Sequence, residues 1–384
     1  MLEQFWQNYP ANFTHFKSPI VQWHEIPTFL VGEYLFYCLT IIALIHAIRS
    51  TRLHILIWVA SLLSGTANDV FFMFLPVVDN FWQAQATIMI TPRLPLYIPC
   101  VYICFMYYSV IAAWNLSAKP IATAALAGIL ALLFYGPYDI LGAKFLWWTW
   151  HMTDASVHER LLGVPVGSSM WILTFVFSFS LLLQYSTKKD PNIGLKKSLG
   201  CLAVCCLFTT PLMILQMTLL DLFEKNNAPS IKTFLANLAL YILLFFISFF
   251  YRGKQKNPVH SISNKSNKML SYAIFFYYLM LLLLIFTGKP EKHVSIGVHQ
   301  TYGPCDAIGT DITGHTRKLY VCENDNNDFF IVCDPLPPKA YENWYRICGK
   351  PYQNKTLWVG GMLFYCILGF FSYTYLFKGR YVTT

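Results

Sequence analysis

The sequence has few charged residues for its length. Only 12% of its 384 residues are charged, 56% are hydrophobic, and the mean hydropathy is +0.45. A soluble domain carries about a quarter charged residues, so this composition excludes an ordinary water-soluble protein. We predict an integral membrane protein whose first partner is the lipid bilayer.

The sequence also lacks the short motifs of common enzyme classes. It contains no P-loop, dinucleotide fingerprint, nucleophile elbow or kinase signature. It has neither the His-Glu-x-x-His pattern of zinc peptidases nor repeated histidine boxes, so we expect no metal and no cofactor. The first 26 residues lack the basic start and short apolar stretch of a cleavable signal peptide, so the first span is expected to target the protein.

Apolar runs long enough to cross about 30 Å of hydrocarbon recur along most of the chain. These runs predict an all-α polytopic transmembrane helix bundle of about nine spans, with a small disulfide-stapled extracytoplasmic loop. The predicted spans are 27 to 48, 53 to 76, 94 to 114, 120 to 136, 165 to 185, 198 to 220, 232 to 251, 269 to 287 and 358 to 377. These spans divide the chain into three parts. Residues 1–287 form the membrane bundle of spans one to eight, residues 288–357 form the extracytoplasmic cysteine-bearing loop, and residues 358–384 form the last span and a cytoplasmic tail.

Basic residues collect in alternate loops. One set of loops carries fourteen cations and only one acid, Asp190. Those cations are Arg49, Arg52, Lys119, Lys188, Lys189, Lys196, Lys197, Arg252, Lys254, Lys256, Lys265, Lys268, Lys378 and Arg380. The positive-inside rule makes this face cytoplasmic, with the N-terminus outside, the C-terminus inside and the protein in the secretory pathway or plasma membrane. The formal net charge of +9 therefore indicates orientation in a membrane, not binding to nucleic acid.

The loop 288–357 falls on the outer side and holds four cysteines. In an oxidising compartment they can form two disulfides, with three possible pairings. They are Cys305, Cys322, Cys333 and Cys348. Asn12 and Asn354 lie in N-glycosylation sequons that also fall outside, whereas the sequons at Asn115 and Asn264 fall inside and should be unused.

Two stretches of the sequence share one order of features. In each, an apolar span ends near an acid, a loop rich in aromatic residues follows, and an arginine and a proline precede the next span. Asp69 and Arg93 belong to the first stretch, and Asp139 and Arg160 belong to the second. The two units would have the same orientation, as in the parallel repeats of some membrane proteins.

Ionisable residues concentrate at the predicted outer ends of the spans. Charges in apolar surroundings cost several kcal/mol unless they are paired or hydrated, so they usually face a bundle interior or an aqueous cavity. We predict that one outward-facing cavity holds five candidate catalytic residues, Glu33, Asp69, Asp139, His151 and Asp154. The candidate substrate-binding residues are Trp147, Trp148, Trp150, Arg93, Arg160 and Tyr138. Structural pairing of Asp69 with Arg93 and of Asp139 with Arg160 is the alternative for the ionisable residues. For the three tryptophans we favour an interfacial aromatic belt over a substrate lining.

The residues from Phe134-Tyr-Gly-Pro-Tyr-Asp139 to Gly163-Val-Pro165-Val-Gly-Ser-Ser-Met-Trp171 are similar to a stretch of carotenoid-hydratase-type membrane proteins. The whole chain more closely resembles a family of uncharacterised invertebrate multi-pass membrane proteins. That family is itself similar to bacterial spirocyclases of the avermectin pathway, over roughly the first 250 residues. The cysteine-bearing loop has no counterpart there, so the resemblance does not imply a shared substrate.

Three functions fit these observations. The first is an enzyme acting on an apolar isoprenoid- or polyketide-like substrate, in which Asp139 or Asp69 protonates an alkene or ether and tryptophan rings stabilise the carbocation. The second is a transporter or lipid-binding protein that uses the same polar cluster. The third is a receptor-like structural protein whose disulfide loop binds a partner. Lipids co-purified with the protein would separate the first two from the third.

Overall fold

The computed structural model describes residues 15–75, 78–116, 118–222, 224, 229–250, 264–311, 314–322, 330–333 and 340–378. Within these ranges nine helices are long and apolar enough to cross a membrane, which confirms the predicted helix bundle. They are α3 (Pro27–Ile48), α4 (Arg52–Phe74), α5 (Tyr97–Trp114), α6 (Pro120–Lys144), α7 (Val166–Thr187), α8 (Leu195–Asp221), α9 (Ile231–Phe250), α10 (Asn264–Thr287) and α11 (Lys355–Phe377).

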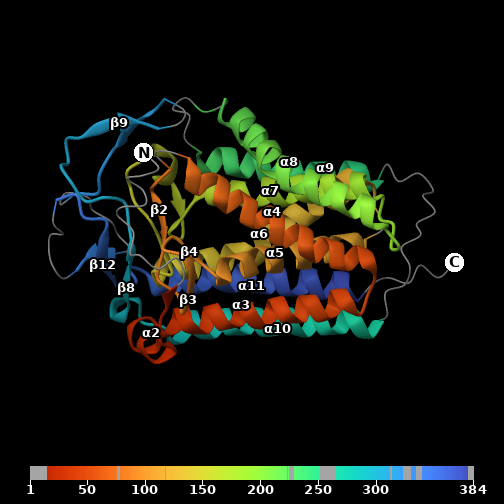
Figure 1. Cartoon of the computed structure of the whole chain (residues 1–384), viewed down its shortest axis with the longest axis horizontal. Helices are drawn as coiled ribbons and strands as arrows, with labels where there is room; N and C mark the ends of the chain where they lie inside the picture. Colours follow the sequence, from red (N-terminus) through yellow and green to blue (C-terminus); the bar gives the residue numbers. More distant parts are fainter. Residues whose placement is uncertain are drawn as a thin grey trace.

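The helices run side by side, and the strands gather at one end of the bundle (Figure 1). Helix α5 is almost completely buried, and α6 is largely buried. Helices α3, α4, α6 and α11 pack against α5, while α7, α9, α10 and α11 pack against α6. The outer helices α8, α9 and α11 keep most of their apolar side chains on the outside of the bundle, as expected for helices whose solvent is lipid.

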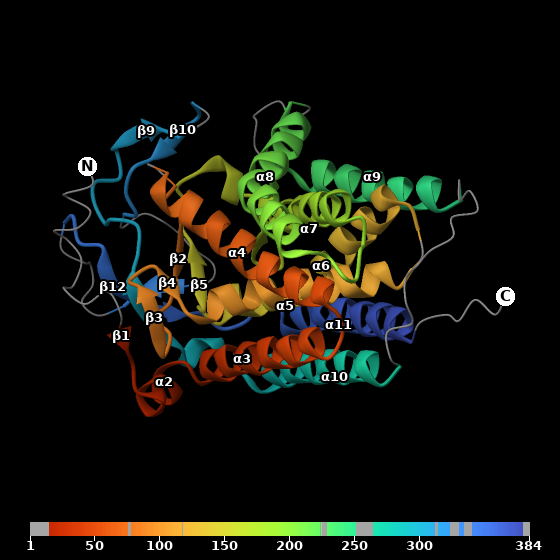
Figure 2. The same cartoon turned by 45° about the vertical axis from the view of Figure 1, so that its right-hand side comes forward.

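The strand-bearing end is built from three loops that bind one another. Strand β2 (Phe81–Gln83) pairs antiparallel with β5 (Trp148–Trp150), so the loop after α4 and the loop after α6 form one ribbon. The Gln85 backbone N–H donates to the Ile296 carbonyl at 3.1 Å, which attaches the loop after α10. The short helix α2 (Pro19–Glu25) and strand β1 (His15–Phe16) lie at this end beside the start of α3 (Figure 2).

The structure supports the internal repeat. In the first unit, α4 is followed by β2 and by a hairpin of β3 (Ile88–Thr91) and β4 (Leu94–Pro95) that leads into α5. In the second, α6 is followed by β5 and by a hairpin of β6 (Arg160–Leu161) and β7 (Val164–Pro165) that leads into α7. Leu162 and Gly163, in the turn of this second hairpin, both have positive φ, as a two-residue type I′ turn requires.

The fourth span is longer than predicted. We expected it to end at Gly136 because a glycine and a proline follow one another there, but α6 continues through Pro137 to Lys144. Proline is tolerated inside transmembrane helices because neighbouring helices and side chains satisfy the freed backbone groups. A Cβ on Gly136 would lie 2.7 Å from the Tyr365 ring, so this glycine allows α11 to approach α6 closely. Asp139 therefore lies inside the helix and not beyond its end.

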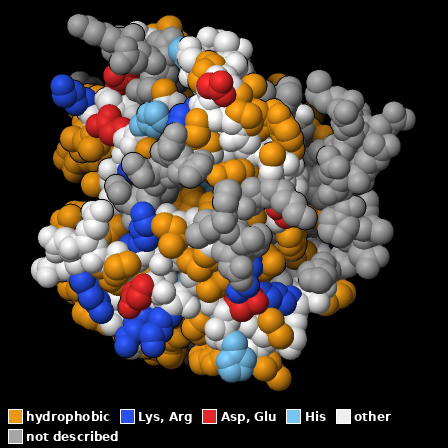
Figure 3. Space-filling view, turned by 90° about the vertical axis from the view of Figure 1, so that its left-hand side faces the viewer, with side chains coloured by type: hydrophobic (Ala, Val, Ile, Leu, Met, Phe, Trp, Pro, Cys, Tyr) orange, Lys and Arg blue, Asp and Glu red, His pale blue; other side chains and the backbone are white. Residues whose placement is uncertain are grey.

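The loop after α10 forms a small sheet with its own core. Strand β12 (Trp344–Gly349) lies between β8 (Val294–Val298) and β11 (Phe330–Val332), and a separate hairpin joins β9 (Ile308–Thr310) to β10 (Thr316–Lys318). The predicted disulfides are present and join Cys305 to Cys322 and Cys333 to Cys348. The small core consists of Leu146, Tyr302, Val321, Phe330, Tyr345 and Ile347. The surface of this end carries charged and histidine side chains scattered among apolar ones (Figure 3).

Candidate functional site

Two of the predicted acids occupy equivalent places in the repeat. Asp69 lies five residues before Phe74, the last residue of α4, and Asp139 lies five residues before Lys144, the last residue of α6. Both acids are therefore more than one helical turn inside their helices, near the strand-bearing end of the bundle.

Asp69 is held by a chain of hydrogen bonds across three helices. The Tyr102 hydroxyl of α5 donates to Asp69 Oδ1 at 2.6 Å, and Asn68 Nδ2 donates to the same hydroxyl at 3.1 Å. The Thr210 hydroxyl of α8 donates in turn to Asn68 Oδ1 at 3.0 Å. These contacts fix the position of the acid without placing a cation beside it.

Asp139 has a similar but simpler environment. The Ser168 hydroxyl, near the start of α7, donates to Asp139 Oδ2 at 2.7 Å. Asp139 is buried, and within the part of the chain that the structure describes its Oδ1 has no hydrogen-bond partner. In both units, then, an acid near the end of the first helix accepts a hydrogen bond from a hydroxyl near the start of the second.

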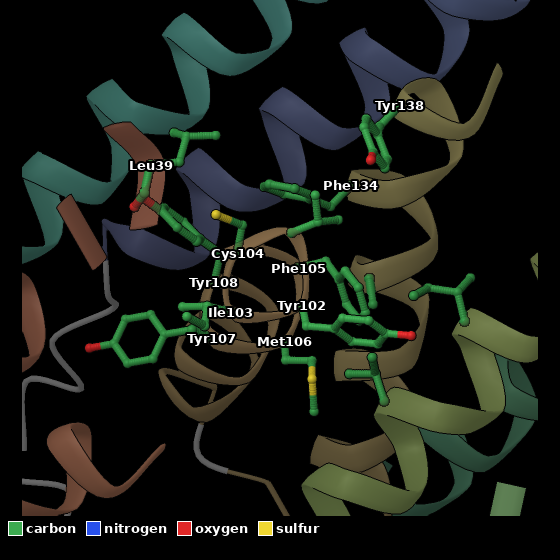
Figure 4. Close-up of a cluster of buried hydrophobic side chains, with 14 of the residues drawn as sticks. Leu39, Tyr102, Ile103, Cys104, Phe105, Met106, Tyr107, Tyr108, Phe134 and Tyr138 are labelled. Carbon is green, nitrogen blue, oxygen red and sulfur yellow. The ribbon is translucent and has the colours of Figure 1, made fainter. Parts of the chain in front are cut away.

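Aromatic rings lie between the two acids. Trp171 of α7 contacts Tyr102 with a ring-centroid distance of 6.0 Å and Tyr135 of α6 at 5.9 Å, and Tyr135 contacts Tyr138 at 5.3 Å. Tyr102 and Phe105 extend from one side of α5, whereas Tyr107 extends from the opposite side (Figure 4).

Residues of α5 and α6 connect the two acids to these rings. Tyr135 lies four residues before Asp139 on α6, so the two share one face of that helix. Tyr102 provides the link to Asp69 through its hydroxyl hydrogen bond. We call Asp69, Asp139, Tyr102, Tyr135, Ser168 and Trp171 the acid–aromatic cluster.

Several members of this cluster are only partly buried. Asp69 and Tyr135 both keep part of their surface accessible. Ser168 and Trp171 are also only half-buried.

Glu33 is engaged by Thr87 and Tyr37 and by no member of the cluster among the hydrogen bonds of the described residues. The Thr87 hydroxyl donates to Glu33 Oε1 at 2.5 Å, and the Thr87 backbone N–H lies 3.1 Å from Oε2. The Tyr37 hydroxyl donates to Oε1 at 2.9 Å. These contacts attach the loop between β2 and β3 to α3, so the geometry favours a structural role for this carboxylate.

Asp154 lies outside the cluster, in the strand-bearing end. Its Oδ1 is 3.2 Å from Arg317 Nε, while Asn80 and Thr153 donate to Oδ2 at 2.9 and 2.8 Å. Arg317 also pairs with Asp79. Burial raises the pKa of Asp154, and the charge of Arg317 opposes that rise. One buried arginine thus joins the three loops that form this end of the molecule.

His151 also lies in the strand-bearing end, buried against a second histidine. Its Nε2 is 3.3 Å from Nδ1 of His299, which stacks on the ring of Tyr345. Burial lowers the pKa of His299 to about 3 and holds the pKa of His151 well below its usual range, with His299 and Arg160 adding to the effect. Both rings are therefore neutral at physiological pH. The structure does not bring all five predicted acids and bases into one cavity.

Among the ion pairs of the described residues, neither Asp69 with Arg93 nor Asp139 with Arg160 occurs, the pairing considered as the alternative to a shared cavity. Arg93 stacks on the Trp82 ring at 3.9 Å and reaches the Val78 carbonyl. Arg160 donates to the carbonyls of Val157 at 2.8 Å and Trp150 at 3.2 Å. The reason is geometric, because both arginines lie in the hairpins of the strand-bearing end, while the acids lie inside helices.

The tryptophans do not form an interfacial belt. Trp147 and Trp148 are fully buried. Trp147 covers Gly32 of α3 and donates to the Thr28 hydroxyl at 3.1 Å, and Trp148 covers Gly142 of α6. Trp150 is half-buried in β5. Tyr138 contacts the Trp148 ring at 4.7 Å, so these aromatic side chains close the strand-bearing end of the bundle above the acids.

Sequence reasoning missed several members of the cluster. Tyr102, Tyr135 and Ser168 were not selected, although Tyr135 and Ser168 lie within the stretch that carries the resemblance. The available signal was helical spacing, because Ser168 and Trp171 are three residues apart and share one face of α7. Asn12 and its sequon lie outside the described residues.

Comparison with known proteins places the chain in one family. Residues 12–377 match the family model described as a domain of unknown function, DUF7802, so the chain belongs to that family. No curated protein and no solved structure matches the chain. The family description carries no activity, and neither spirocyclases nor carotenoid hydratases are among these matches.

Proposed function

We propose that this protein is a membrane-embedded acid catalyst for an apolar, isoprenoid- or polyketide-like substrate, with Asp139 as the general acid. The observation that carries the proposal is Oδ1 of Asp139, which has no hydrogen-bond partner among the described residues and is buried next to the rings of the acid–aromatic cluster. A carboxyl group without a neighbouring cation is far less costly in such surroundings as the neutral acid than as an ion. The neutral acid is the form from which a proton can be donated.

The proposed step transfers one proton. The π electrons of a substrate alkene form a C–H bond with the Asp139 proton, the O–H bond breaks, and a carbocation remains on the adjacent carbon. The hydrogen bond from Ser168 stabilises the resulting carboxylate. The faces of Tyr135 and Trp171 stabilise the cation. The Asp139 carboxylate then takes a proton from a carbon next to the cation, which gives an isomerised or cyclised alkene and restores the acid.

The apolar outer surfaces of the helices support entry of the substrate from the lipid. Asp69 supplies a second acid–base group at the equivalent position of the repeat, and Tyr102 connects it to the aromatic rings. The role of the strand-bearing end in this proposal is to exclude bulk water, because Trp147 and Trp148 close the bundle there.

Deuterium exchange tests this proposal without knowledge of the natural substrate. The purified protein in lipid vesicles is incubated in D₂O with a panel of polyprenols and linear polyenes, and deuterium in each compound is measured by mass spectrometry. We expect wild type to incorporate deuterium. Asp139→Asn should lower the rate of incorporation about a hundredfold or more, which is the usual contribution of a general acid to a rate. Asp190→Asn, in the loop between α7 and α8, is the matched control and should keep wild-type activity.

Two results would count against the proposal. One is the absence of exchange into every compound of the panel. The other is equal exchange by wild type and Asp139→Asn. The thermal unfolding midpoint of each variant separates a loss of chemistry from a loss of fold, since Asn keeps the shape of Asp and can still accept the Ser168 hydrogen bond.

A proton-coupled transporter is the second candidate. The observation that favours it is the parallel repeat, with acids at equivalent positions. A hydrogen-bonded chain also runs from Asp69 through Tyr102 and Asn68 to Thr210. This candidate predicts flux of a panel compound across vesicles without deuterium incorporation. Asp69→Asn would then abolish the dependence of that flux on a pH gradient.

A further inference from the structure

A groove runs between α3 and α10 on the outer surface of the bundle, away from the acid–aromatic cluster. Leu35, Cys38 and Ile42 of α3 form one wall. Residues of α10 form the other wall and include Met269, Tyr272 and Phe276. Both views of the molecule show α3 and α10 lying side by side (Figures 1 and 2). The groove therefore faces the region that lipid occupies.

The groove has one charged residue, and that residue lies at one end. Lys268, at the start of α10, is exposed and belongs to the lining. Within the described part of the chain it has no hydrogen bond or ion pair. The candidate membrane span of α10 begins at Asn267, so Lys268 lies at the level where lysine side chains reach the lipid phosphates.

The length of the groove matches one leaflet. Phe276 lies eight residues after Lys268 on α10, which corresponds to about 12 Å along a helix. Half of the hydrocarbon core is about 15 Å thick. An acyl chain in the groove would therefore extend from the membrane surface at Lys268 almost to the bilayer midplane at Phe276.

The geometry points to a binding site for an anionic phospholipid in this groove. One acyl chain lies between α3 and α10, and the phosphate with its negatively charged headgroup pairs with Lys268. The hollow exists because Cys38 and Ala273 are small where the neighbouring lining residues are large. This site is independent of the proposed acid catalysis.

Native mass spectrometry tests the site. The full-length protein is equilibrated with vesicles of mixed phosphatidylcholine and phosphatidylglycerol, and the lipids that it retains are counted. We expect wild type to retain phosphatidylglycerol in preference to phosphatidylcholine. Lys268→Gln should reduce the ratio of the two retained lipids about fivefold, which is the usual contribution of one lysine at a membrane surface. Lys378→Gln removes an exposed lysine at the end of α11 and should change nothing.

Filling the groove provides the second arm of the test. Cys38 is exposed, so Cys38→Trp should abolish retention of both lipids at this site without disturbing the core. Ile41→Trp changes an exposed residue of α3 that does not line the groove and should bind as wild type does. Equal retention of the two lipids by wild type, or unchanged selectivity in Lys268→Gln, would overturn the proposal.

Discussion

The aspartates of this protein occupy two different environments. Asp69 and Asp139 lie inside transmembrane helices and accept hydrogen bonds from the hydroxyls of Tyr102 and Ser168. In the strand-bearing end, Asp79 and Asp154 share the buried guanidinium of Arg317. A buried carboxylate paired with a cation is committed to holding the structure together, because removing its partner is costly. A carboxyl group held only by hydroxyls remains able to exchange a proton.

The largest expected effect concerns the paired acids. Arg317→Met should lower the free energy of unfolding of the strand-bearing end by about 3 to 5 kcal/mol, because it leaves the carboxylate of Asp154 buried without its cation. The thermal midpoint of the purified protein measures this change. Lys292→Met removes an exposed cation from the same end and serves as the control. Asp139→Asn, in contrast, should unfold near the wild-type temperature. Equal thermal midpoints for Arg317→Met and Asp139→Asn would contradict the distinction between the two environments.

The histidine pair gives an intermediate effect that depends on pH. The pKa values of His151 and His299 are lowered in the folded protein, so below about pH 6.5 the unfolded chain binds protons that the folded chain does not. Stability is therefore fully present above pH 6.5 and falls as the pH drops, by up to about 1.4 kcal/mol per pH unit for each histidine.

Unfolding midpoints between pH 7.5 and pH 4.5 measure this dependence. The double variant His151→Phe, His299→Phe keeps aromatic rings that cannot titrate, so its profile should be flatter than that of wild type. His158→Phe changes an exposed histidine nearby and should leave the profile unchanged. Identical profiles for the double variant and wild type would show that the pair does not control acid sensitivity.

The smallest expected effect concerns the side of the membrane on which the strand-bearing end lies, and not stability. If the strand-bearing end is extracytoplasmic, Asn354 should carry a glycan, and deglycosylation should shift wild type on a gel by one glycan more than it shifts Asn354→Gln. Asn354 is exposed and caps α11, with its Oδ1 accepting from the Leu357 N–H at 3.1 Å. Asn264, at the start of α10, is at the opposite end of the bundle, and Asn264→Gln should not alter the shift. Shifts of equal size in wild type and Asn354→Gln would contradict this site.

The sequence alone determined the class of structure. Low charge and recurring apolar runs required helices in lipid, because a membrane span must satisfy its own backbone hydrogen bonds. The four cysteines of the late loop indicated two disulfides, and the structure contains both. The order of features around Asp69 and Asp139 indicated a repeat, and the structure supports it with matching strands and hairpins in both units.

Only the tertiary structure decided which polar residues meet. Glu33, Asp154 and His151 resemble Asp139 in sequence, since each is an ionisable residue near the predicted end of a span. Their roles diverge because contacts from distant parts of the chain reach them: Thr87 binds Glu33, Arg317 binds Asp154 and His299 packs on His151. No local pattern encodes such contacts. Asp139 remained available because α6 continues past Pro137 and places it inside the bundle, next to Ser168.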